Sequence, residues 1–163
     1  MNDLTATDKR EVAERHVVLV APDVHWNTGN IGRTCIGVGA HLHLIKPLGF
    51  SLDDRKVRRA GLDYWKDVKL TVWDRFDDLL NGLKPERDAI QLFTKNAPKP
   101  FWEMPARCKM VLVFGSETKG LPASILDRFA DAHYHIPTDR AIRSLNLSTA
   151  VGIALYESLR SFP

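Results

Sequence analysis

Cysteines and long apolar runs are both scarce in this chain of 163 residues. Its two cysteines, Cys35 and Cys108, are too few for a disulfide framework, so we expect two reduced thiols. The longest apolar runs, such as residues 110–114, are far too short to span a bilayer. The first 15 residues mix both charge signs without an apolar stretch, which argues against a signal peptide. These absences predict a cytoplasmic protein with no membrane contact, a flexible tail over residues 1–15 and a single domain over 16–163.

A strong excess of one charge and the common nucleotide-binding patterns are missing as well. Lys and Arg number 23 against 20 Asp and Glu, a formal net charge of +3, which permits a nucleic-acid partner without requiring one. No G-x-G-x-x-G fingerprint occurs. In the glycine-rich segment 115–120, Lys119 precedes the second glycine, unlike the lysine of a P-loop.

The histidines are too few in any one place to predict a metal site. His41 and His43 are spaced by two, as are His133 and His135, so each pair shares one face of a strand. Two ligands do not make a zinc site, and no cysteine or third histidine stands suitably near in the sequence. We expect solvent-facing strand histidines and no metal.

What the sequence does contain is an alternation of strand-like and helix-compatible segments. Strands are predicted over 16–21, 41–45, 68–73, 89–94, 109–114 and 133–136, and helices over 28–38, 52–61, 74–83, 122–129 and 146–160. The alternation predicts an α/β fold with a parallel sheet covered on both faces. Asp53 or Asp54 and Asp74 are plausible N-caps, and glycines stand where three helices should stop, at Gly39, Gly61 and Gly82.

In open α/β sheets, ligands gather beyond the carboxyl ends of the strands. Three unusual loops leave such ends, after Ala21, Phe114 and Ile136. The coincidence predicts one shared site at this edge. Ile136 itself could offer backbone groups and an apolar side chain to a flat ring.

The first loop runs from Asn27 to Arg33. Asn27 and Gly29 suit a turn, Thr28 or Asn30 can cap a helix, and Arg33 lies about one helical turn beyond Asn30. An amide beside a guanidinium suits a phosphate or a ribose hydroxyl. The alternative is a tight turn with a surface arginine.

In the second loop, Gly115 and Gly120 let the backbone approach a ligand closely. Glu117 is then either a polar anchor near the ligand or a charge in the first turn of a helix. In the third, Ser144, Asn146 and Ser148 crowd the mouth of the last helix, where they could cap it or receive a polar ligand.

Two further features each have a structural and a functional interpretation. A basic cluster is either a solvated helix face or an RNA-backbone contact; it comprises Arg55, Lys56, Arg58 and Arg59. The apolar stripe of the last helix, over 147–159, is either core or a subunit interface.

Taken together, the loops resemble the three motifs of the SPOUT family of RNA 2′-O-methyltransferases, and most closely its small single-domain group (TrmL type) that methylates the tRNA wobble position. The resemblance covers residues 16–160 and is carried by Asn27-x-Gly29-Asn30-x-x-Arg33, Phe114-Gly115-x-Glu117-x-x-Gly120-Leu121, and Ile136-Pro137 followed by Ser144-Leu145-Asn146-Leu147-Ser148-x-Ala150. The segments 46–50 and 58–64 also resemble that group.

This resemblance implies a C-terminal trefoil knot, a homodimer, S-adenosylmethionine as the cofactor and the anticodon arm of tRNA as the partner. Cofactor contacts would come from Leu92, Thr94, Gly115, Ile136, Ser144 and Leu145. Arg33 would act at the target 2′-hydroxyl, surrounded by Asn30, Glu117, Ser144 and Asn146. One departure is that Gly32 replaces a bulkier apolar residue before the motif arginine, which could loosen the start of the helix.

Because a guanidinium stays protonated in proteins, we interpret Arg33 as orienting the hydroxyl or phosphate and stabilising developing negative charge. The residues do not identify the group that takes the proton, the tRNAs used or the target base. Two alternatives stay open: a relative that methylates another tRNA or rRNA nucleotide, and a non-catalytic knotted RNA-binding protein.

Overall fold

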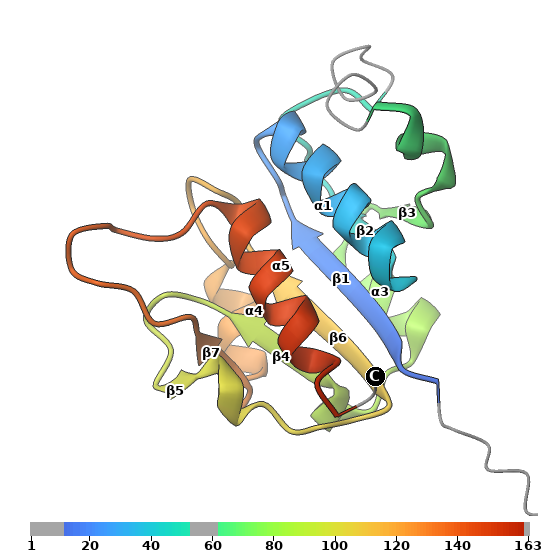
Figure 1. The fold of residues 1–163 in the computed structure, drawn as a ribbon. Helices are drawn as coiled ribbons and strands as arrows, with labels where there is room; N and C mark the ends of the chain where they lie inside the picture. Colours follow the sequence, from blue (N-terminus) through green and yellow to red (C-terminus); the bar gives the residue numbers. More distant parts are fainter. Residues whose placement is uncertain (1–11, 53–61, 162–163) are drawn as a thin grey trace, which may run out of the picture.

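The computed structural model describes residues 12–52 and 62–161 (Figure 1). The expected helix over 52–61 therefore lies almost wholly outside the described residues, as do its caps Asp53 or Asp54 and Gly61. The same holds for the basic cluster Arg55, Lys56, Arg58 and Arg59. Within the described ranges, no helix has the length and apolarity needed to cross a membrane.

A seven-stranded sheet forms the centre of the molecule, in the order β3-β2-β1-β6-β4-β7-β5. Every pair of neighbouring strands is parallel, which confirms the predicted sheet. The strands are β1 (Glu14–Val20), β2 (His41–Ile45), β3 (Leu70–Trp73), β4 (Ile90–Phe93), β5 (Lys99–Pro100), β6 (Lys109–Phe114) and β7 (His133–His135). Only β5, two residues long, falls in a segment that the sequence predicts as loop.

Helices cover both faces of this sheet. On one face, α1 (His25–Val38) and α5 (Leu147–Ser158) lie side by side (Figure 1). On the other face lie α3 (Phe76–Leu83) and α4 (Ala123–Arg128). Short 3-10 turns, η1 (Leu62–Asp67), η2 (Arg87–Ala89) and η3 (Phe101–Glu103), connect the elements.

The alternation of side chains along β1 divides the core into two layers. Val17 and Leu19 pack beneath α1 and α5, whereas Val18 and Val20 pack beneath α3 and α4. Because both faces are covered, residues 17–20 of β1 and 110–114 of β6 are continuous apolar runs, as expected for parallel strands.

Helix ends follow the sequence prediction in one case and depart from it in two. Gly39 terminates α1 in the left-handed conformation (φ 71°), where its N–H meets the Cys35 and Ile36 carbonyls. Gly82 lies inside α3, which ends at Leu83. A glycine is needed there because a Cβ would lie 2.5 Å from the ring of Trp73. Asp74 does not cap α3: it pairs with Lys46 at 2.8 Å, and the helix begins two residues later.

The strand β1 begins before the expected end of the tail. Glu14 already pairs with Lys109 of β6. Arg15 is only 3% exposed, and it donates from Nε to the Ser158 hydroxyl at 2.9 Å. These two residues thus belong to the folded domain, not to the tail predicted over residues 1–15.

Candidate active site

The three predicted loops do meet at one edge of the sheet. Ala21, Gly115 and Ile136 immediately follow β1, β6 and β7, and Thr94 immediately follows β4, which lies between β6 and β7. These strands are neighbours, with Phe93 of β4 paired with both Phe114 and Tyr134. The carboxyl ends of parallel strands therefore bring these loops together, where ligands of open α/β sheets are bound.

The loop after β6 is closed so tightly that its first residue has to be glycine. A Cβ on Gly115 would lie 2.0 Å from the carbonyl carbon of Gly120. Ser116 and Gly120 exchange two backbone hydrogen bonds, of 3.3 and 3.0 Å, and Gly120 has a positive φ of 68°. The loop is thus a preformed turn that projects Glu117.

Glu117 is not a first-turn helix charge, since α4 begins only at Ala123. Its two carboxylate oxygens take different donors: the backbone N–H of Asp23 at 2.8 Å and the Asn27 side-chain amide at 3.0 Å. Thr118 donates its hydroxyl to the Asp23 carboxylate and so lowers the pKa of Asp23. The loops after β1 and β6 are therefore clamped together.

Asn27 extends this clamp to the third loop. Because its Nδ2 donates to Glu117, its Oδ1 must be the acceptor, and it receives the Nδ2 of Asn146 at 3.0 Å. The Oδ1 of Asn146 in turn accepts the Ser148 N–H at 2.9 Å and so caps α5. The polar network Glu117–Asn27–Asn146 thus joins all three loops, with every amide orientation determined by its neighbour.

The network contains Asn27. It does not contain Asn30, the asparagine of this motif that was predicted to lie at the site. The helix α1 begins at His25, three residues before the predicted start, so that Asn27, Thr28 and Asn30 lie inside it and do not cap it. Asn27 is 3% exposed, whereas Asn30 is exposed and uses its backbone carbonyl to accept from Thr34. Asn27 and Asp23, which connect the loops here, were not among the predicted site residues, although Asn27 stands in the first motif and Asp23 shortly before it.

Four other residues predicted for the site lie outside the Glu117–Asn27–Asn146 network. Arg33 is exposed, and its guanidinium lies 4.9 Å from the centroid of the Tyr64 ring. Ser144 is exposed and Leu145 is half-buried in the loop before α5. The side chain of Leu92 is fully buried in the core beneath α3 and α4, so only its backbone could face a ligand.

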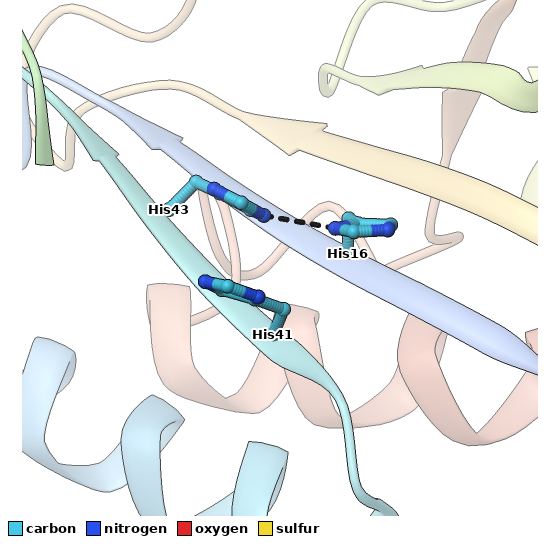
Figure 2. Close-up of side chains that lie close together, drawn as sticks. All are labelled: His16, His41 and His43. Carbon is cyan, nitrogen blue, oxygen red and sulfur yellow. Dashed lines mark hydrogen bonds between the residues drawn. The ribbon is translucent and has the colours of Figure 1, made fainter. Parts of the chain in front are cut away.

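A second polar cluster lies on β1 and β2, on the amino-terminal side of the loops that follow them. Figure 2 shows His16 from β1 beside His41 and His43 from β2, where the parallel register places His16 opposite His41. His43 is 1% exposed, so the expectation that it faces solvent is wrong, and His16 is the third histidine that spacing along the chain did not find.

The hydrogen bonds of this cluster determine its tautomers. Trp73 donates its indole N–H to His43 Nδ1 at 3.0 Å, so the proton of neutral His43 sits on Nε2. That proton is donated to His16 Nδ1 at 2.9 Å (Figure 2). His16 Nε2 in turn donates to Glu14 at 2.7 Å. Burial lowers the pKa of His43 to about 3 and also lowers that of His16, in agreement with neutral rings.

Three imidazoles within 4.8 Å of one another raise the question of a metal site, and the ring geometry does not suit one. Nε2 of His43 carries a proton, as shown above. The rings of His41 and His43 are stacked at 4.2 Å with an interplanar angle of 11°. An imidazole binds a metal in its own plane, and two stacked parallel rings share no such point. The arrangement is a hydrogen-bonded chain.

Known proteins similar to this chain are methyltransferases by name. A model of the SpoU rRNA Methylase family matches residues 14–156. A tRNA (cytidine(34)-2'-O)-methyltransferase from Burkholderia cenocepacia is 42% identical over 146 residues, which cover 89% of this chain and 94% of that protein. A relative from Listeria monocytogenes is 43% identical over 148 residues, covering 89% of this chain and 86% of its own length.

A solved structure described as giving structural insights into the 2-OH methylation of C/U34 on tRNA superimposes with a TM-score of 0.80. It is 40% identical, and the match covers 91% of this chain and 95% of that one. An AdoMet-bound rRNA methyltransferase from Sinorhizobium meliloti shares the fold, with a TM-score of 0.81 at 24% identity; 94% of this chain and 60% of that one are covered.

Proposed function

We propose that this chain, which belongs to the SpoU rRNA Methylase family, methylates the ribose 2′-hydroxyl of tRNA nucleotide 34, a cytidine or a modified uridine, with S-adenosylmethionine as the donor. Relatives at about 40% identity over nearly their whole length carry that activity in their names. The observation in this structure that carries the proposal is the Glu117–Asn27–Asn146 network, because it builds a single site from three separate loops.

The residues at the carboxyl edge fit the proposed cofactor chemically. Backbone groups of Gly115 and Ile136, the apolar side chain of Leu145 and the hydroxyls of Thr94 and Ser144 match an adenosine, which has a flat apolar ring and a polar ribose. Leu92 would contribute through its backbone. S-adenosylmethionine supplies a methyl group on a sulfonium, and its displacement needs no metal.

The side chains of this site then have separable tasks. The network Glu117–Asn27–Asn146 holds the three loops at a constant separation, which favours alignment of the ribose oxygen with the methyl donor. Arg33, always protonated, offers N–H donors to the hydroxyl or a neighbouring phosphate and stabilises negative charge as it develops. Asn30 is exposed one helical turn before Arg33 and would reach the RNA only at the rim of the site.

A homodimer formed through α1 and α5 is part of the proposal. These helices lie side by side on one face (Figure 1), and α5 exposes two large apolar residues one turn apart, Ile153 (36% exposed) and Tyr156 (59% exposed). A second copy would cover them. We place the enzyme in the cytoplasm with its tRNA substrate.

The path of the chain supports a trefoil knot in the C-terminal part. The strands β6 and β7 lie on opposite sides of β4, with α4 on one face of the sheet and α5 on the other. The chain after β6 therefore passes beyond β4 and returns over the opposite face. An experimentally determined backbone trace tests this. When its two termini are extended away from the molecule, the path either contains a trefoil knot or contains none.

Methyl transfer from labelled S-adenosylmethionine to unmodified total tRNA, mapped by nucleotide, tests the function. We expect label on the ribose of nucleotide 34. Label at another tRNA or rRNA nucleotide would support the first alternative, and cofactor-independent RNA binding without transfer would support a non-catalytic protein.

The substitution Arg33→Ala separates catalysis from cofactor binding. We expect methyl transfer to be lost, since the guanidinium is the group that stabilises the developing negative charge in this proposal, while the affinity for S-adenosylmethionine measured by calorimetry stays within about twofold. Transfer close to the wild-type rate in this variant would exclude the assigned role.

A further inference from the structure

Gly32 precedes Arg33 in the middle of α1, and its missing side chain is used for packing. A Cβ on Gly32 would lie 3.0 Å from Cζ3 of Trp65 and 3.2 Å from Cγ2 of Val68. The indole of Trp65, in η1, thus occupies the space that a bulkier residue would fill. From the sequence, we expected that Gly32 could loosen the start of the helix. It lies instead in the middle of α1, where it leaves a notch that receives η1.

The segment that enters this notch is tied to the sheet immediately afterwards. Val68 donates its N–H to the Trp65 carbonyl at 3.3 Å, and the Lys69 carbonyl accepts the N–H of Leu42 in β2 at 2.8 Å. The strand β3 follows from Leu70. The position of η1 against α1 is therefore set on one side by Trp65 in the notch and on the other by the sheet.

This docking brings Tyr64, the neighbour of Trp65, against Arg33, the neighbour of Gly32. The Arg33 guanidinium lies over the Tyr64 ring, 4.9 Å from its centroid. Among the side chains that the structure describes, no carboxylate lies within salt-bridge distance of Arg33. An aromatic ring attracts the face of a guanidinium and leaves the N–H donors at its edge free, whereas a carboxylate would occupy them.

We propose that Tyr64 is a positioning residue for Arg33: its ring, held in place by Trp65 in the Gly32 notch, orients the guanidinium while leaving its donors available to RNA. The inference rests on the proposed function, since it assigns Tyr64 a task only if Arg33 acts in methyl transfer. It explains why Gly32 and the aromatic pair Tyr64 and Trp65 occur together in this chain.

The test compares Tyr64→Leu, which removes the ring, with Tyr64→Phe, which keeps it. In methyl transfer to tRNA we expect Tyr64→Leu to lower kcat about threefold to tenfold, with KM for tRNA and the affinity for S-adenosylmethionine within about twofold. Tyr64→Phe should recover most of the lost kcat. Trp102→Leu, which replaces an exposed aromatic residue of η3, serves as the matched control and should behave as wild type.

Two further variants show whether the effect passes through Arg33. Gly32→Ala keeps both partners but requires the Trp65 ring to shift by a few tenths of an ångström, and it should lower kcat in the same direction, by less than Tyr64→Leu. In an Arg33→Lys background, whose smaller cation lacks the planar face, Tyr64→Leu should cause little further loss, so the two effects are not additive.

The outcomes separate this inference from the function on which it rests. If Arg33→Ala is inactive but Tyr64→Leu keeps the wild-type kcat, the positioning role is excluded and the proposed function stands. A raised KM for tRNA with unchanged kcat would make Tyr64 an RNA contact, and equal losses in Tyr64→Phe and Tyr64→Leu would exclude the ring face as the cause. Full activity in Arg33→Ala would overturn the function itself.

Discussion

Asn27 shows how much of the site depends on one buried amide. It is the only member of the Glu117–Asn27–Asn146 network that contacts both of the others. Its two ends are chemically distinct, because one donates to a carboxylate and the other accepts from an amide. A residue of the same shape with two acceptor ends cannot replace it.

We therefore expect Asn27→Asp to lower the free energy of unfolding by about 1–3 kcal/mol at pH 7, since the new carboxylate faces Glu117 without a donor between them. Methyl transfer should fall with it. Urea unfolding measures the first effect. Asn30→Asp makes the same charge change at an exposed position of the same helix and should cost less than about 0.5 kcal/mol; equal losses in both variants would contradict the role given to Asn27.

The choice between these two asparagines could not be made from the sequence. Both stand in the motif, where Asn27 suits a turn and Asn30 suits a helix cap. Which asparagine faces Glu117 depends on where α1 starts. It starts at His25, and its N-cap residue, Val24, makes no side-chain capping hydrogen bond. An uncapped start leaves no local sign in the sequence, so the direction in which each side chain points was left undetermined.

At the scale of elements, α3 is joined to the sheet through a glycine and not only through its apolar face. Gly82 lies against Trp73 of β3, and Trp73 is held by its hydrogen bond to His43 of β2. A shift of the indole away from α3 would break that bond. The helix, β3 and β2 are thus coupled through one side chain.

Gly82→Ala tests this coupling. In an exposed helix the change would be favourable by about 1 kcal/mol, but here the new Cβ meets the indole, and we expect a net loss of about 1 kcal/mol or more in the free energy of unfolding. Asn81→Ala, at the adjacent exposed position of the same helix, should instead stabilise by a few tenths of a kcal/mol. A stabilised Gly82→Ala protein would show that the indole moves freely.

For the molecule as a whole, the histidine chain predicts how stability depends on pH. The pKa values of His16, His41 and His43 are all lowered, chiefly by burial, and Lys69 and Lys109 add to the effect on His41 and His16. Between the ordinary histidine pKa of about 6.5 and these lowered values, the unfolded chain binds protons that the folded protein does not. Stability is therefore full above about pH 6.5 and falls as the pH drops below it.

Urea unfolding between pH 7 and pH 5 measures this fall, in a window above the titration of most carboxylates. Each proton bound only by the unfolded chain contributes a slope of up to about 1.4 kcal/mol per pH unit. His43→Gln removes the most strongly shifted ring and should flatten the slope. A slope unchanged in that variant would assign the acid sensitivity to other groups.

The proposed dimer is the other property of the whole molecule. A lysine in place of Tyr156 would put a charge at the centre of the apolar face of α5, where burial against a second copy would be unfavourable. We expect Tyr156→Lys to sediment as a monomer and to lose activity, with the secondary structure seen by circular dichroism unchanged. A wild-type protein that sediments as a monomer would contradict the assembly.

The succession of strands and helices along the chain and the three loops at the carboxyl edge can be predicted from the sequence, because apolar periodicity and glycine-rich turns are local signals. Three contacts emerge only in the folded protein: Asn27 joins the loops, His16 lies beside His41 and His43, and Trp65 fills the gap at Gly32. Each of these contacts joins residues from different elements. Their distance in space depends on strand order, register and helix start, which no short stretch of sequence encodes.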